Sequence, residues 1–180
     1  MTPTADREDI KYKGPSHAEG VNAYSPNIVL EYCGTRLLLT GDSNEVNEEE
    51  FCQAYSQGVD VDILKVGHHG SAGSSTAEFL SLVDAEYAVI QCGVDNKHDH
   101  PRQEALDRLK ASGVQSVYRS DTNGHIVLTI SQDGFTFDTE IDLADLETNF
   151  VGITVNSFAP VLRFEMVELD LFEKRLKFVA

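Results

Sequence analysis

Apolar and polar positions alternate along the middle of the chain in short blocks that predict strands separated by helices. The apolar runs Val59–Val66 and Tyr87–Cys92 have the length of buried strands, and Val114–Tyr118 is also strand-like. Helices are predicted from the hydroxyl-rich start at Ser74 to Val83, and from Pro101 to a stop at Gly113. Strands that alternate with helices are typical of α/β proteins.

Antiparallel hairpins are predicted at both ends of this alternating region. The paired strands are Asn27–Tyr32 with Arg36–Thr40, and Gly124–Ile130 with Phe135–Asp138. The pair Asp133-Gly134 is a strong turn signal for the second hairpin. A further helix is expected from Asn44 to Tyr55, where an asparagine cap is followed by acidic residues. The pattern as a whole predicts an α/β layer architecture with a mixed sheet.

Composition divides the chain into three parts. Residues 1–21 are polar with scattered charges, and the chain as far as Tyr24 is expected to form a flexible or extended lead-in. Residues 22–141 carry the predicted strands and helices and form the domain. Residues 142–180 are apolar and mostly β-prone, and they form a C-terminal extension that the pattern does not place.

Charge and hydropathy narrow the class of protein. With 180 residues and 41% hydrophobic content, the chain can build one sizeable core. Thirty acidic against fourteen basic side chains give a net charge of −16, which disfavours non-specific binding to nucleic acid or to an anionic membrane. A membrane segment and a signal peptide are not expected, so the prediction is a cytoplasmic protein or a soluble domain of a larger one. The three cysteines have no CxxC spacing and are expected to be reduced core thiols.

Imidazole and carboxylate side chains follow three of the strand-like runs. Asp42 comes directly after the first hairpin, His68 and His69 follow the next strand, and His100 lies after the third. These are the ligands that Zn²⁺ or Mn²⁺ uses when a position must stay open for water. Open α/β sheets place their sites at strand ends, so the sequence predicts a metal site there.

Several short motifs occur in an order that resembles a known family. They are Asn22 with Ser25, Leu39–Asp42, Leu64–Ser71, Asn96 with His100-Pro101, and Ser120-Asp121 with Gly124. Together they resemble the second half of a metallo-β-lactamase-fold domain of the type in ComEC-like competence proteins, over about residues 22–130. The resemblance implies a mixed-sheet αββα fold.

The resemblance also implies roles for individual residues. Asp42 and His100 correspond to metal-site residues, and one of His68 and His69 to a metal-site or catalytic histidine. We predict Asp42, His69 and His100 as metal ligands, and His68 with Lys65 as catalytic residues. Which of the two neighbouring histidines is the ligand stays open, because adjacent side chains point in different directions. One weak Zn²⁺ or Mn²⁺ site is expected, and a dinuclear centre is not. The alternative is a purely structural role, in which Asp42 is a turn or helix-capping residue and the histidines are solvated loop residues.

The chain departs from the family pattern in one respect. The family has an earlier HxHxDH segment that supplies ligands to both metals, and upstream of Asp42 this chain has only His17. The fold is therefore expected to be incomplete, as a fragment or as a half that another chain completes.

Two functions follow as hypotheses. The first is metal-assisted hydrolysis of an anionic phosphodiester substrate, related to DNA uptake, once the site is completed. The second is a catalytically incomplete module that serves in oligomerisation or partner binding, either as a homo-oligomer or with its missing half. Residues 142–180 would then cover an exposed apolar face or pair with a second copy.

Overall fold

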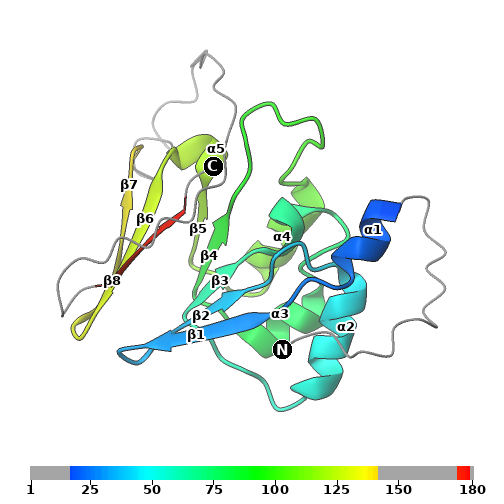
Figure 1. Cartoon of the computed structure of the whole chain (residues 1–180), viewed down its shortest axis with the longest axis horizontal. Helices are drawn as coiled ribbons and strands as arrows, with labels where there is room; N and C mark the ends of the chain where they lie inside the picture. The colour runs from blue at the N-terminus through cyan, green and yellow to red at the C-terminus, as the bar shows by residue number, and fades with distance from the viewer. Residues whose placement is uncertain (1–16, 142–173, 179–180) are drawn as a thin grey trace.

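A mixed sheet of five strands forms the centre of the molecule (Figure 1). The computed structural model describes residues 17–141 and 174–178. The strands lie in the order β1 (Ile28–Tyr32), β2 (Thr35–Leu39), β3 (Ile63–Lys65), β4 (Tyr87–Ile90) and β5 (Ser116–Arg119). The β1–β2 hairpin is antiparallel and the other neighbours are parallel, so the carboxyl ends of β2 to β5 share one edge.

The α-helices of the described residues are α1 (His17–Asn22), α2 (Glu45–Ala54), α3 (Ala77–Val83), α4 (Gln103–Ala111) and the single turn α5 (Ser120–Asn123). Of these, α2 to α4 connect the parallel strands of this sheet, while α1 precedes β1 and α5 follows β5. Side-chain caps start two of them: Asn44 accepts from the Val46 amide at α2, and Thr76 accepts from the Phe79 amide at α3. These caps satisfy amides that have no partner inside the helix.

Two apolar cores lie on opposite faces of the five-stranded sheet. On one face, Leu38, Leu64 and Ile90 pack with residues of α2, α3 and α4. On the other face, Leu37 and Val89 pack against a smaller antiparallel sheet in the order β7 (Gly134–Thr139), β6 (Ile126–Ser131) and β8 (Lys174–Phe178). Alternate residues of each strand therefore face different cores, as the two-residue period of a strand requires.

A buried carboxylate fixes the loop between the 3-10 turn Gly67–Gly70 and α3. Glu48 on α2 accepts hydrogen bonds from the amides of Ser75 and Thr76, at 2.5 and 2.7 Å. Burial raises the pKa of Glu48, while these two bonds and the charge of Arg108 act in the opposite direction. Arg108 also donates to backbone carbonyls of the same loop. The hydroxyl-rich stretch is thus held by protein groups and caps α3.

The structure confirms the predicted α/β class, the mixed sheet and both hairpins. The predicted outer helical layer of an αββα fold is not found in the described part of the chain, where α2, α3 and α4 cover only one face (Figure 1). Of the C-terminal extension, β8 is a strand that pairs with β6, in line with its β-prone sequence. The rest of that extension lies outside the described residues.

Two expectations were wrong. The lead-in as far as Tyr24 was expected to be flexible or extended, but its residues His17–Asn22 form the helix α1, and residues 1–16 lie outside the described residues. Tertiary contacts hold the segment that follows α1, because the Asn47 side chain donates to the carbonyls of Ala23 and Ser25. Cys33 is exposed in the β1–β2 turn and is not a core thiol, whereas Cys52 and Cys92 are buried. No helix among the described residues has the length and apolar character needed to cross a membrane.

Candidate functional site

The predicted site residues lie beyond the carboxyl ends of the parallel strands. Asp42 follows β2, His68 and His69 follow β3, and the segment that leads to His100 follows β4. The sheet therefore brings to one edge residues that are far apart in the sequence.

The two histidines occupy a strained turn directly after β3. His68 and His69 have φ of 46° and 54°, in the left-handed region that side chains other than glycine rarely adopt. The flanking glycines are required by close packing. A Cβ on Gly67 would lie 2.9 Å from the Ser43 carbonyl oxygen, and one on Gly70 would lie 2.6 Å from Cβ of Pro101. The strain persists because packing on both sides fixes the turn.

His69 is held between a backbone carbonyl and a carboxylate. Its Nδ1 lies 2.6 Å from the Gln91 carbonyl oxygen, and its Nε2 lies 3.3 Å from Oδ1 of Asp42. A carbonyl only accepts, so Nδ1 carries the proton and donates it to Gln91. The Nε2 atom of a neutral His69 then presents a lone pair to a carboxylate. A proton on Nε2 or a bound cation would remove the repulsion between these two acceptors.

The donor set and its spacing fit a divalent metal. Two ligands of a tetrahedral Zn²⁺, each about 2.0–2.1 Å from the ion, lie about 3.3 Å apart. A metal-binding histidine commonly donates its other N–H to a backbone carbonyl, as His69 does. However, residues 17–141 and 174–178 contain no group of three or more histidine, cysteine, aspartate or glutamate side chains arranged to hold a metal. The described residues thus supply two adjacent donors.

The charges around Asp42 favour its ionised form. The hydrogen bond to His69 lowers the pKa of Asp42, partly opposed by burial, and the charges of His69, Lys65 and His68 lower it further. The backbone N–H of Asp42 donates a hydrogen bond to Oγ of Ser25 at 3.2 Å. Asp42 is therefore a carboxylate at neutral pH.

His68 faces a different partner from His69. The Nε2 atom of His68 lies 3.3 Å from Nδ2 of Asn22, at the end of α1. Burial lowers the pKa of His68, so the neutral ring that accepts from Asn22 is favoured. The two neighbouring imidazoles therefore point to different groups, as expected for adjacent side chains.

Lys65 lies beneath the loop that carries Asp42. Its side chain is buried, and Nζ donates to the Gly41 carbonyl oxygen at 2.9 Å. Burial lowers the pKa of Lys65 to about 8, and the charge of Asp42 partly opposes the shift. In this arrangement Lys65 holds the backbone next to Asp42 in place, and its positive charge stabilises the Asp42 carboxylate.

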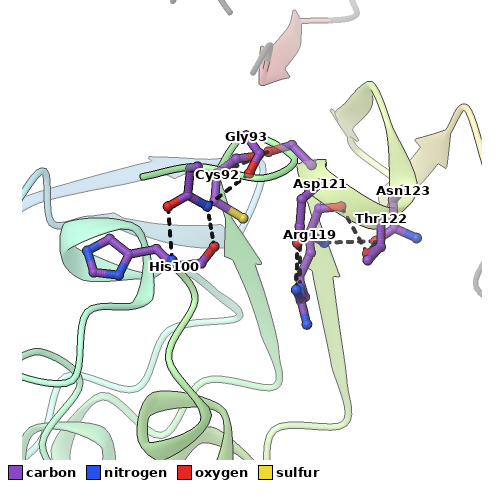
Figure 2. Close-up of polar contacts among 9 residues, drawn as sticks. Cys92, Gly93, His100, Arg119, Asp121, Thr122 and Asn123 are labelled. Carbon is purple, nitrogen blue, oxygen red and sulfur yellow. Dashed lines mark hydrogen bonds and ion pairs between the residues drawn. The ribbon is translucent and has the colours of Figure 1, made fainter. Parts of the chain in front are cut away.

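His100 contacts His68 rather than the Asp42–His69 pair. The ring centroids of His100 and His68 are 5.6 Å apart in an edge-to-face contact, and His98 stacks on His100 at the same distance. Asn96 positions the segment, because its side chain donates to the His100 carbonyl and accepts from the His100 amide (Figure 2). The Nδ1 atom of His100 is buried without a hydrogen-bond partner, which leaves a donor or acceptor for a group not contained in the described residues.

Acid is expected to destabilise the metal-free protein through His100. Burial, followed by the neighbouring imidazoles, lowers the pKa of His100 from 6.5 to about 4. Between these pH values His100 is protonated in the unfolded state and neutral in the folded state. The free energy of unfolding therefore falls as the pH falls from about 6.5 to about 4. Urea unfolding in EDTA at pH 7 and pH 5 measures this loss. His100→Gln should lose less stability over that interval than the wild type, and an equal loss in both proteins would contradict the assignment.

The remaining histidines are not assigned as site residues. His98 is exposed, as expected. His125 is exposed and pairs with Glu140 at 2.8 Å, which fits a structural role. The His17 side chain lies outside the described residues.

Sequence reasoning gave no role to three groups that shape the site. Asn22 and Asn96 belonged to the motifs of the resemblance, but only the fold shows that they bind His68 and the His100 backbone. The Gln91 carbonyl, which orients His69, is a backbone atom and leaves no signal in residue identity. Its position at the end of β4 was the available clue.

The homologues of this chain are competence proteins of the ComEC family. Competence protein ComA of Neisseria gonorrhoeae is 31% identical over 131 residues, which cover 72% of this chain and 19% of the relative. ComE operon protein 3 of Bacillus subtilis is 37% identical over 97 residues, which cover 54% of this chain and 12% of the relative.

A third relative, recombination protein 2 of Haemophilus influenzae, is 30% identical over 112 residues, which cover 62% of this chain and 14% of the relative. The chain thus spans less than a fifth of the length of each of these curated relatives. No family model matches the chain.

Proposed function

We propose that this chain is the metal-binding half of a metallo-β-lactamase-like hydrolase module that acts on a phosphodiester during DNA uptake. The observation that carries the proposal is the placement of His69, which donates to Gln91 and faces Asp42 at 3.3 Å. The kinship with competence proteins supports the link to DNA uptake. The activity and substrate of the whole relatives are part of the proposal.

In this proposal Asp42 and His69 hold one divalent ion, and His100 offers a further nitrogen at the edge of the site. The remaining ligands come from outside the described residues. A bound Zn²⁺ or Mn²⁺ would polarise a phosphoryl oxygen and lower the pKa of a bound water. It would also provide the positive charge that a protein with a net charge of −16 needs to receive an anionic substrate.

The surrounding residues have separate tasks. Lys65 keeps the Gly41–Asp42 backbone in place and stabilises the carboxylate. His68 is kept neutral by burial, and its position beside His100 suits proton transfer to or from a bound group. The acidic surface disfavours non-specific DNA binding, so a substrate would be recognised at the site itself.

Calorimetric titration of the metal-free protein with Zn²⁺ and with Mn²⁺ tests the proposal. We expect one ion per chain, bound weakly because two ligands are supplied by the described residues. Hydrolysis of bis(p-nitrophenyl) phosphate and of single-stranded DNA is then measured with and without the metal. The proposal fails if neither ion binds, or if the Asp42→Ala, His69→Ala double variant binds it equally well.

The second candidate function is that of a catalytically incomplete module for oligomerisation or partner binding. Two observations favour it: the described residues hold no three-ligand group, and the edge strand β1 exposes Ile28, Val29 and Leu30. Consecutive apolar residues lie on both faces of a strand, so neither face of β1 is fully covered. The molecular mass in solution is measured for the whole chain and for a chain that lacks the residues after Asp142. A dimer of the whole chain would indicate self-association, and association only after truncation would indicate that the extension covers the apolar face. A monomer in both cases would count against oligomerisation.

A further inference from the structure

A hydroxyl directly after β5 is hydrogen-bonded to the peptide group whose carbonyl contacts His69. The last register pair between β4 and β5 joins Ile90 to Arg119, and the backbone pairing ends there. Ser120 comes next, at the start of α5, and is 7% exposed. Its Oγ accepts from the Cys92 amide at 2.9 Å and donates to the Cys92 carbonyl at 2.8 Å. The side chain thus replaces the backbone partner that Cys92 would otherwise lack.

One planar peptide group links this hydroxyl to His69. The Gln91 carbonyl and the Cys92 N–H belong to the same peptide group, in which they point in opposite directions. The carbonyl accepts from Nδ1 of His69 at 2.6 Å, and the N–H donates to Ser120. Rotation of this peptide would break both bonds, so the bond to Ser120 limits the direction in which the carbonyl can point.

The corner that carries Ser120 is itself held firmly. Arg119 and Asp121 form an ion pair at 2.5 Å, and the Arg119 amide donates to Oδ1 of Asn123 at 2.8 Å (Figure 2). Burial, and then the negative charge of Asp121, raise the pKa of Cys92 to about 12, so its thiol stays neutral beside that carboxylate. The residues on both sides of Ser120 are thus held by a hydrogen bond and an ion pair of their own, which keeps Ser120 next to Cys92.

We propose that Ser120 is a positioning residue of the site: its hydroxyl orients the Gln91–Cys92 peptide, which fixes the proton of His69 on Nδ1 and leaves Nε2 for the ligand shared with Asp42. The significance for a bound metal rests on the proposed function. The effect on the His69 tautomer does not, because it is a property of the metal-free protein.

The test is the tautomer of His69 in the metal-free protein, read from long-range ¹H–¹⁵N spectra of the imidazoles in EDTA. The His69 signals are assigned by their absence in His69→Gln. For the neutral ring of His69, we expect the Nδ1–H form in the wild type and a mixture of tautomers in Ser120→Ala. Ser120→Thr, which keeps a hydroxyl, should restore the wild-type pattern. If Ser120→Ala does not fold, Ser120→Cys keeps the volume with a weaker hydrogen-bonding group and is used instead.

Ser112→Ala is the matched control. The Ser112 hydroxyl donates to a backbone carbonyl at 2.8 Å at the end of α4, away from the His69 contacts, so this variant should leave the tautomer unchanged. An unchanged His69 in Ser120→Ala, or a change that also appears in Ser120→Thr or Ser112→Ala, would overturn the proposal.

Zn²⁺ titration separates this inference from the proposed function. If the wild type binds Zn²⁺, Ser120→Ala should raise the Kd about tenfold, the lower end of the usual effect of losing a group that orients a ligand. A wild-type protein that binds no Zn²⁺ removes the proposed function, while the tautomer measurement still decides the role of Ser120.

Discussion

Replacing Asp42 with alanine is expected to weaken Zn²⁺ binding by more than about a hundredfold, beyond the effect of losing a group that only orients a ligand. The variant removes one of the two donors that face each other at 3.3 Å and leaves a single imidazole. A lone histidine does not hold a divalent ion against water at micromolar concentrations. Calorimetric titration of the wild type and the variant at pH 7.5 measures the difference.

Asp99→Ala is the matched control for Asp42→Ala. It removes the same charge from an exposed carboxylate in the segment just before His100, where Asp99 pairs with Arg102 at 3.5 Å. Its Zn²⁺ affinity should equal that of the wild type, because the carboxylate is exposed to solvent and makes no contact with His69. Equal losses in both variants would mean that Asp42 acts through general electrostatics and is not a ligand.

Replacing Gly70 with alanine is expected to destabilise the fold by about 3 kcal/mol, the sum of backbone strain and overpacking. Gly70 has φ of +79°, and a Cβ there would lie 2.6 Å from Cβ and 3.2 Å from Cα of Pro101. The Arg102 amide also donates to the Gly70 carbonyl at 2.8 Å, so the histidine turn cannot move away without losing a hydrogen bond. Urea unfolding monitored by circular dichroism gives the free energy of unfolding of each variant.

Gly113→Ala separates the two contributions. Gly113 has φ of +95°, and its added Cβ would meet nothing within 4 Å, so only the backbone strain applies. We expect this variant to lose about 1 kcal/mol, at the low end of the cost of a positive φ in a residue other than glycine. If Gly70→Ala lost no more free energy of unfolding than Gly113→Ala, the turn Gly67–Gly70 would not pack tightly against Pro101.

Local sequence signals were enough for most of the secondary structure. The asparagine before α2 and the hydroxyl before α3 both cap their helices, and the Asp-Gly pair closes the β6–β7 hairpin. These signals act within a few residues, so they could be read before the fold was known. The helix α1 was missed because the contacts around it come from Asn47 and His68, which lie more than twenty residues away.

The sequence by itself predicted which residues are candidates for the chemistry and that they lie at strand ends. Asp42, His68, His69 and His100 were found because they follow strand-like apolar runs and belong to the motifs that carry the resemblance. Only the tertiary structure decided their partners: His69 faces Asp42 and Gln91, His68 faces Asn22, and His100 meets His68 edge to face and stacks with His98. Partner choice depends on backbone carbonyls, left-handed turns and strand register, and these arise only when parallel strands distant in sequence pair at one edge of a sheet.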